Sequence, residues 1–156
     1  MNKPFLLLTS LCLFFNSLAL LTKAEQVVIS EIMYHPKDGG HEFVEIENLT
    51  STPFDIALWR LSGGVDFEFP DFSTASPRNT FLKAFEKIVI CDTDPGTFRA
   101  AYGLPSAVRV FGPWEGNLNN GGERINLKDK NGINRCTVRY DNQGNWPVAA
   151  DGGGHS

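Results

Sequence analysis

The last residues of the chain place three catalytic side-chain types close together. Asp151, His155 and Ser156 supply the carboxylate, imidazole and hydroxyl of a Ser-His-Asp triad. Three glycines separate Asp151 from His155, however, and ordering such a segment at a terminus costs conformational entropy that no neighbouring residue offsets. A triad also needs a rigidly oriented base and an oxyanion site that faces the nucleophile. We therefore interpret this segment as a glycine-rich turn and predict no catalytic residues.

Acidic and histidine side chains also gather early in the chain, where they could hold calcium. This group comprises Glu31, His35, Asp38, His41, Glu42, Glu45 and Glu47. Calcium prefers oxygen ligands, but no regular ligand loop of the form DxDxDG is present, and alternating carboxylates are also typical of a solvated strand face. A second candidate calcium loop, at Asp92 and Asp94, has an equally simple alternative in which Asp94 caps a helix. We predict no metal site and no cofactor.

Cys91 and Cys136 lie in apolar, strand-like stretches. In an oxidising compartment they could form a disulfide. They could equally be two buried thiols, because the sequence does not supply the Cα separation that a disulfide requires. No CxxC or His–Cys spacing indicates zinc. Asn48 begins a formal glycosylation sequon, which matters only in a eukaryotic secretory pathway.

The first 24 residues have the pattern of a secretory signal peptide. Lys3 precedes an apolar run from Phe5 to Leu21, and Thr22 and Ala24 are small residues suited to a cleavage site. A membrane anchor is the alternative, since the run is about long enough to span a bilayer, but polar residues interrupt it. We predict export to the cell surface, the periplasm or the medium, with a mature domain of residues 25–156.

The charge balance of the mature chain disfavours nucleic acid as a partner. Removing residues 1–24 takes away Lys3 and Lys23, which leaves 12 basic and 18 acidic residues and a net charge of −6. An acidic chain repels phosphate backbones unless its cations cluster, and here the cations are scattered along the sequence.

The elements that must position these side chains are short strands separated by turn-forming residues. In VDFEFP, for example, Val65, Phe67 and Phe69 alternate with acidic residues, which is the period of a half-buried strand. The DKNG segment at 129–132 predicts a tight turn. The predicted strands are QVVISEIM (26–33), EFVEIEN (42–48), FDIALWRL (54–61), VDFEFP (65–70), EKIVICD (86–92), ERINLKD (123–129) and INRCTVRY (133–140).

One short helix is predicted at DPGTFRAAYG, with Asp94 as its cap, Pro95 at its first position and Gly103 at its end. Seven or so short strands with regular turn signals predict an all-β, antiparallel β-sandwich of immunoglobulin-like type. The Cys-Trp-Cys framework of antibody domains is absent, so this likeness is architectural.

Several stretches resemble the lamin-tail domain family, and in particular its secreted bacterial branch. They are VISEIMYHP, HEFVEIENLTSTPFDIALWRLSGG, FGPWEGNLNNGGERINLKDKNG and NWPVAADGGGHS, which occur in the order of the family from about Val27 to the last residue. The resemblance implies a compact all-β module without catalytic residues. In the family, a segment like the last one leads into an apolar final strand. We therefore expect a fragment of a longer protein, or a sandwich whose final strand is missing or supplied by another chain.

The resemblance implies an exported, non-catalytic binding or scaffolding module, whose partner is a protein or a component of the cell envelope. Two alternatives stay open: the recognition domain of a larger secreted hydrolase, and a calcium-stabilised adhesion module. Exposed edge strands and the loops carrying Trp114 and Trp146 are candidate contact surfaces. Both tryptophans lie beside a proline, and structural packing is the alternative for them.

Overall fold

The computed structural model describes residues 26–37, 40–71, 80–144, 146 and 151–152. The predicted signal peptide, Asp38, His155 and Ser156 lie outside these residues. No helix within the described part of the chain is long and apolar enough to cross a membrane.

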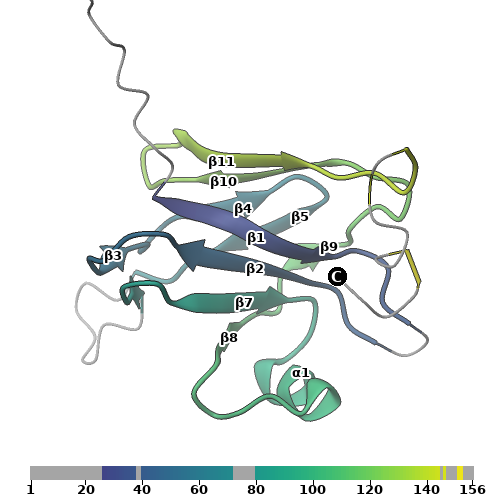
Figure 1. The fold of residues 1–156 in the computed structure, drawn as a ribbon, viewed down its shortest axis with the longest axis horizontal. Coiled ribbons are helices and arrows are strands. Elements are labelled where there is room, and N and C mark those ends of the chain that lie inside the picture. The colour runs from purple at the N-terminus through teal and green to yellow at the C-terminus, as the bar shows by residue number, and fades with distance from the viewer. Residues whose placement is uncertain (1–25, 38–39, 72–79, 145, 147–150, 153–156) are drawn as a thin grey trace, which may run out of the picture.

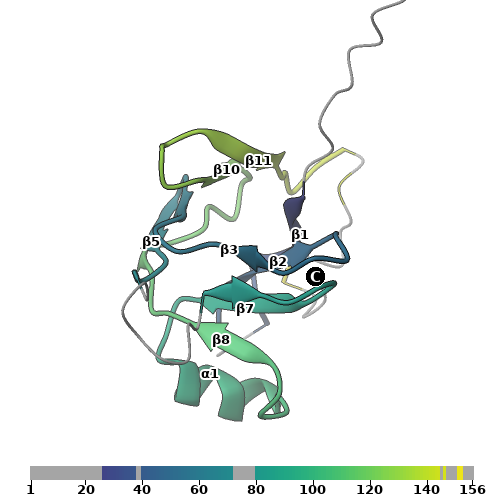
Figure 2. The ribbon, with the colours of Figure 1, turned by 90° about the vertical axis from the view of Figure 1, so that its left-hand side faces the viewer.

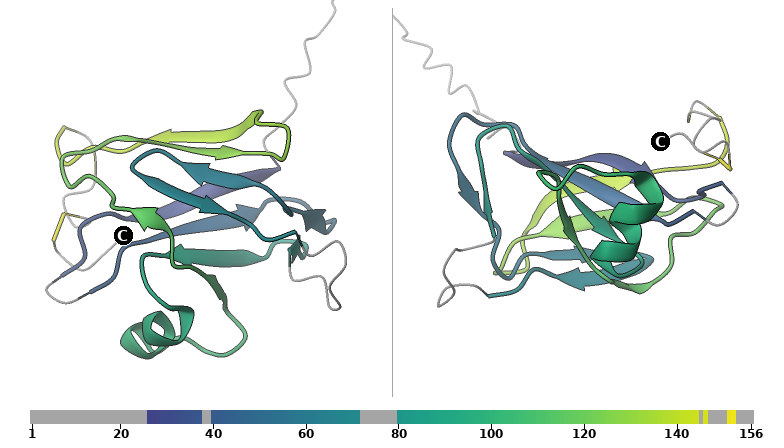
Figure 3. Two further views of the ribbon diagram at one scale, coloured as in Figure 1. Left: turned by 180° about the vertical axis from the view of Figure 1, so that it is seen from behind. Right: turned by 90° about the horizontal axis from the view of Figure 1, so that it is seen from below.

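Two β-sheets form the body of the molecule (Figure 1). The four-stranded sheet has the order β1 (Val27–Met33), β2 (Phe43–Asn48), β7 (Lys87–Cys91) and β8 (Arg109–Phe111). The five-stranded sheet has the order β11 (Asn134–Arg139), β10 (Arg124–Lys128), β4 (Arg60–Ser62), β5 (Val65–Glu68) and β9 (Glu115–Gly116). A small separate ladder pairs β3 (Phe54–Asp55) with β6 (Phe81–Leu82). Figure 2 and the two views of Figure 3 show the sheets from the other sides. The all-β, immunoglobulin-like sandwich predicted from the sequence is confirmed.

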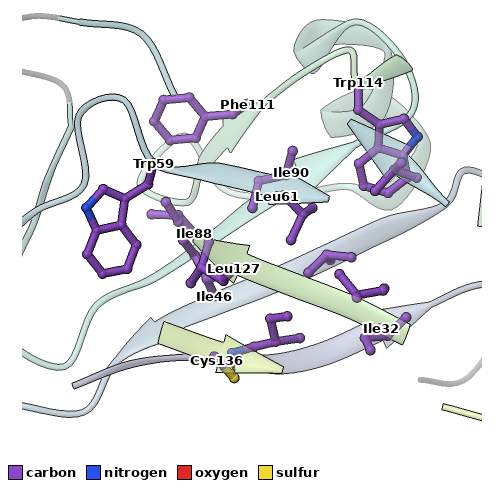
Figure 4. Close-up of a cluster of buried hydrophobic side chains, with 14 of the residues drawn as sticks. Ile32, Ile46, Trp59, Leu61, Ile88, Ile90, Phe111, Trp114, Leu127 and Cys136 are labelled. Atoms are coloured by element: carbon purple, nitrogen blue, oxygen red, sulfur yellow. Dashed lines mark hydrogen bonds between the residues drawn. The ribbon is translucent and has the colours of Figure 1, made fainter. Parts of the chain in front are cut away.

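The core lies between the sheets because each strand alternates buried and solvent-facing side chains. In β2, Val44 and Ile46 are fully buried, whereas the glutamates between and after them are not. Ile125 and Leu127 of β10 meet them from the opposite sheet as part of one continuous cluster. Figure 4 shows this cluster, with Trp59 and Trp114 at its sides.

The structure departs from the predicted strands at one long stretch and at three short ones. FDIALWRL is not a single strand: a turn closed by Trp59 N donating to Ile56 O separates β3 from β4, and Leu58 adopts a φ of 58° there. The strands β6, β8 and β9 were not predicted, because two or three residues are too few to show a periodic pattern.

The helix α1 (Pro95–Tyr102) is confirmed in detail. The Asp94 carboxylate accepts hydrogen bonds from Gly96 N at 2.9 Å and Thr97 N at 3.0 Å, and Gly103 ends the helix in the left-handed conformation. The helix connects β7 to β8, which pair in parallel, and parallel neighbours require such a crossover. It lies against the outer face of the four-stranded sheet, where Phe98 packs on Phe43 with ring centroids 5.6 Å apart.

The two cysteines predicted to lie in strands are both buried free thiols. Cys91 belongs to the small cluster under α1, and Cys136 belongs to the main core. The Cys91 thiol donates to Thr93 O and to Phe111 O, while the Cys136 sulfur accepts a hydrogen bond from Ile29 N at 3.4 Å. Of the two alternatives that the sequence left open, the structure has the buried thiols.

Candidate functional site

Five of the side chains that could do chemistry lie at one end of the sandwich, where the connecting loops are on the right in Figure 1. The connection between β1 and β2, the connection between β7 and α1, and the loop before β10 come together there. Asp92 N donates to Glu42 O and Leu118 N donates to the Glu42 carboxylate, while Gly152 N, near the end of the chain, donates to His35 O. We call this group of His35, His41, Glu42, Asp92 and Asp151 the loop-end cluster.

Asp151, the carboxylate of the triad that the sequence analysis rejected, contacts His35. Its Oδ1 lies 2.6 Å from His35 Nδ1, and the two residues also form a parallel β-bridge. About two fifths of the His35 side chain and a third of the Asp151 side chain are exposed, so the pair lies at the surface. The positions of His155 and Ser156 fall outside the described residues, and the histidine that contacts Asp151 is 116 residues away in sequence. Proximity in sequence pointed to His155 as the partner of Asp151, whereas the contact in the described residues is with His35.

His41 and Asp92 form a second histidine–carboxylate pair. The distance between His41 Nδ1 and Asp92 Oδ1 is 3.1 Å, and Asp92 Oδ2 accepts a hydrogen bond from Glu42 N at 3.0 Å. On the other side, the Tyr102 hydroxyl donates to His41 O at 2.7 Å and accepts from His41 N at 3.3 Å. These contacts join the first hairpin to α1 through its last residue.

Glu42 connects this cluster to the loop before β10. Its Oε2 accepts a hydrogen bond from Leu118 N at 2.9 Å. Desolvation by burial raises the pKa of Glu42, and the neighbouring Asp92 and Glu123 add to that rise, whereas the Leu118 N–H and His35 oppose it. A carboxyl group with a raised pKa is a common feature of functional sites, but structural networks raise pKa values in the same way.

Two stacked tyrosines lie beside the cluster, and the sequence analysis did not single them out. The rings of Tyr34 and Tyr140 have centroids 4.7 Å apart, and both side chains are fully buried. The Tyr140 hydroxyl contacts Asn119 O and Glu123 Oε1, each at 2.9 Å. Burial raises the pKa of Tyr140, and the hydrogen bond to Glu123 raises it further, so the phenol stays neutral. The only sequence signal for this network was an aromatic residue, Tyr140, at the end of the predicted strand INRCTVRY.

The remaining described members of the acidic group, Glu31, Glu45 and Glu47, lie elsewhere. Glu31 and Glu45 are cross-strand partners on β1 and β2, and Lys87 lies 2.7 Å from Glu45 and 3.8 Å from Glu47. Desolvation and then the charge of Glu45 raise the pKa of Glu31. This face of the four-stranded sheet is an ion-paired surface, separate from the two histidines. No group of three or more His, Cys, Asp or Glu side chains within the described residues is arranged to hold a metal ion.

Other residues that the sequence singled out have structural roles. Asn48 is fully buried, and its amide nitrogen donates to the carbonyls of Thr52, Leu82 and Lys83, so the sequon nitrogen is not accessible. Trp114 is 6% exposed and belongs to the main core. Trp146 packs against that core beside Tyr140, at 6.2 Å between ring centroids.

An open cleft of about 430 Å³ lies at the other end of the sandwich. Trp59, Phe54 and Leu58 form its apolar wall, and Asp129 and Arg135 form part of its polar wall. These two charges are already engaged, since Asp129 Oδ2 accepts from Arg135 Nε at 2.9 Å, while Asp129 Oδ1 accepts from the backbone of Asn131 and Ile133. The sequence analysis did not predict this cleft, which forms between segments some 70 residues apart.

Comparison with protein families matches residues 22–142 to the model described as Lamin Tail Domain. The match covers most of the chain and ends before the segment that contains Asp151. A comparison with curated proteins gave no match.

Proposed function

Since the chain belongs to the lamin tail domain family, we propose that it is an exported, non-catalytic module that binds a protein or a component of the cell envelope. The family and the fold support the general kind of molecule, an immunoglobulin-like module. Export, the binding role and the lack of catalysis are proposals.

The observation that carries this proposal is the use made of the titratable side chains in the loop-end cluster. Glu42 accepts from Leu118 N, His41 pairs with Asp92, and His35 pairs with Asp151. Each contact connects two separate segments of backbone. Side chains held in this way stabilise the loops of a sandwich, and such loops, together with edge strands, are the surfaces that β-sandwiches commonly use for binding.

Export is supported by the first 24 residues, in which a basic start, an apolar run and small residues follow one another. Expression of the full chain in a bacterial host, followed by fractionation and N-terminal sequencing, tests this part. We expect a mature product that begins at Glu25 outside the cytoplasm. An intact N-terminus in the cytoplasmic fraction would contradict export, and an intact N-terminus in the membrane fraction would favour the anchor.

Binding is tested by sedimentation of the purified protein with washed cell envelopes of the same host. We expect the protein to sediment with envelopes and to stay in solution without them. The same samples are assayed for soluble fragments released from the envelope polymers. Release above the level of buffer alone would show hydrolysis and would contradict a non-catalytic module.

A further inference from the structure

The outer face of the five-stranded sheet carries a row of positively charged side chains. Ile125 and Leu127 of β10 point into the core, so Arg124 and Lys128 point to the opposite, solvent side of the strand. Arg139 on β11 lies directly opposite Arg124. The helix α1 packs on the other sheet, so it does not cover this face; β4 and β5 of the sheet face the viewer in the left view of Figure 3.

Two cross-strand pairs on this face bring like charges together. Arg124 is the register partner of Arg139, and Lys128 is the register partner of Arg60 on β4. Side chains directly opposite each other in an antiparallel ladder have Cβ atoms about 5 Å apart, and like charges at that distance destabilise the sheet. The isolated domain therefore gains no stability from this arrangement.

Three of these cations also have no partner among the residues that the structure describes. Arg124, Lys128 and Arg139 have neither an ion pair nor a side-chain hydrogen bond in the part of the chain that the structure describes. Arg60, by contrast, pairs with Asp66 on β5. The whole sequence has a net charge of −4, so carboxylates are plentiful. Within the described residues, Asp129 pairs with Arg135, and Asp66 and Glu68 on β5 pair with Arg60, so none of these three carboxylates forms an ion pair with the three remaining cations.

The side chains between the cations are polar and small. Asn126 lies between Arg124 and Lys128, and its Oδ1 accepts a hydrogen bond from the Thr137 hydroxyl at 3.0 Å. Ser62 is the register partner of Asn126 on β4, but its hydroxyl oxygen is buried, without a hydrogen-bond partner among the described residues, and so does not face a ligand. Hydroxyl and amide groups both donate and accept, which suits a ligand rich in hydroxyl groups.

The spacing of the charges also disfavours duplex DNA as the ligand of this face. Residues four apart in a strand are about 14 Å apart, which is the separation of the charges at Arg124 and Lys128 along β10. Duplex DNA carries one charge per about 1.7 Å of its axis, so a row this sparse would neutralise few of its phosphates. No tyrosine, tryptophan or phenylalanine lies among these solvent-facing positions of β10 and β11 to stack on bases.

We propose that the outer face of β10 and β11 binds an acidic polysaccharide, with Arg124, Arg139 and Lys128 pairing with its carboxylates and Asn126 contacting its hydroxyl groups. Arginine suits this role because its planar guanidinium matches a carboxylate in a bidentate geometry. The inference deepens the proposed envelope-binding function, and rests on it, by naming a surface and a class of partner.

The test measures binding of the purified protein to polygalacturonate, with dextran as the uncharged control and duplex DNA as the other polyanion. We expect binding to polygalacturonate that weakens as salt is added, and none to dextran. The variant Arg124→Gln/Arg139→Gln should bind at least about tenfold more weakly, because it removes the two arginines that lie opposite each other on β10 and β11. The matched control, Lys37→Gln/Lys83→Gln, removes the same charge from exposed positions outside this face and should change affinity less than about twofold.

A melting curve separates loss of binding from loss of fold. The Arg124→Gln/Arg139→Gln variant loses a contact between like charges, so it should melt at or above the melting temperature of the wild type. Unchanged affinity in the arginine variant, equal weakening in the lysine control, or tighter binding of DNA than of polygalacturonate would each overturn the proposal. If the protein sediments with envelopes but does not bind polygalacturonate, the proposed function stands and this inference fails. If the protein binds polygalacturonate but does not sediment with envelopes, this inference stands and the proposed envelope binding is refuted.

Discussion

Asn48 is a buried polar residue whose side chain is held by several hydrogen bonds. It is fully buried at the end of β2, where its amide nitrogen donates to three carbonyls and its amide oxygen accepts from the backbone and hydroxyl of Thr50. The side chain therefore satisfies the backbone of the 50–52 turn and of the segment after β6. Buried polar groups are tolerated only when they are paired in this way.

Asn48→Ala should lower the free energy of unfolding by about 3 kcal/mol, because it leaves several buried carbonyls unpaired. Urea unfolding followed by tryptophan fluorescence measures the change. Asn134→Ala, at an exposed position of β11, is the control and should change stability by less than about 0.5 kcal/mol. Similar losses in both variants would refute the role of Asn48.

Asp129 gives the molecule a defined response to acid. Its carboxylate is buried in the β10–β11 turn, and although desolvation raises its pKa, hydrogen bonds from Arg135, Ile133 and Asn131 more than offset that effect and hold it below the usual 3.8. A lowered pKa in the folded state means that the ionised carboxylate stabilises the fold above about pH 4. This contribution is lost as the pH falls through the lowered value.

In Asp129→Asn, the melting temperature should therefore fall at pH 7, and the gap to the wild type should narrow as the pH falls below about 4. Melting curves recorded between pH 3 and pH 7 measure this. Asp66→Asn is the comparison, since Asp66 pairs with Arg60 at the exposed surface and such pairs contribute little. A gap that is constant across the pH range would contradict the assigned role of the Asp129 charge.

At the scale of elements, α1 illustrates how local signals specify a helix. Asp94, Pro95 and Gly103 occupy the positions that capping preferences assign to them, and the sequence alone located the helix correctly. Its tertiary role was not apparent, because the residues that it covers come from three strands. Phe98 contacts Phe43, and Val89 and Cys91 share the same small cluster.

Asp94→Ala should destabilise the protein by about 1 kcal/mol through loss of the two capping hydrogen bonds. Asp94→Asn keeps an oxygen acceptor and should remain within about 0.5 kcal/mol of the wild type. Chemical denaturation of the three proteins under one set of conditions gives both values. Equal losses in the two variants would indicate that charge at this position matters more than capping.

The strand pattern was predictable where it was long. β1, β2, β7, β10 and β11 each have five or more residues and were all predicted. The turns at Leu58 and Phe85 were not, because large apolar residues with φ of 58° and 56° occupy positions where glycine or asparagine is expected. Without the usual turn residue, FDIALWRL looked like one continuous strand.

At the scale of the whole molecule, packing protects both cysteines from solvent, since Cys136 lies in the main core between the sheets and Cys91 lies under α1. Cys91 and Cys136 are buried, and desolvation raises the pKa of the Cys91 thiol to about 11. At pH 8 only about one thousandth of such a thiol is in the reactive thiolate form. Modification of Cys136 therefore requires the sandwich to open, and modification of Cys91 requires α1 to move away from its sheet.

In a Cys12→Ser chain, which removes the remaining cysteine, thiol-specific labelling at pH 8 should be at least about a hundredfold slower in the folded protein than in denaturant. Mass spectrometry should count two labels after unfolding and none at early times before it. Rapid labelling of one cysteine in the native protein would show that its sheet opens locally. A mass two units lower in the unlabelled protein would show a disulfide instead.

The sequence by itself determined the class of fold, since period-two alternation and turn-forming residues act over a few neighbouring positions. It also carried the family likeness, and it located the helix α1. Only the tertiary structure decided which side chains meet. His35 contacts Asp151 across 116 residues, the early acidic group divides between two places, and cations scattered along the sequence become a row on β10 and β11. Such contacts depend on the register between strands and on the packing of loops, and both arise from burial of the whole core, which no short stretch of sequence encodes.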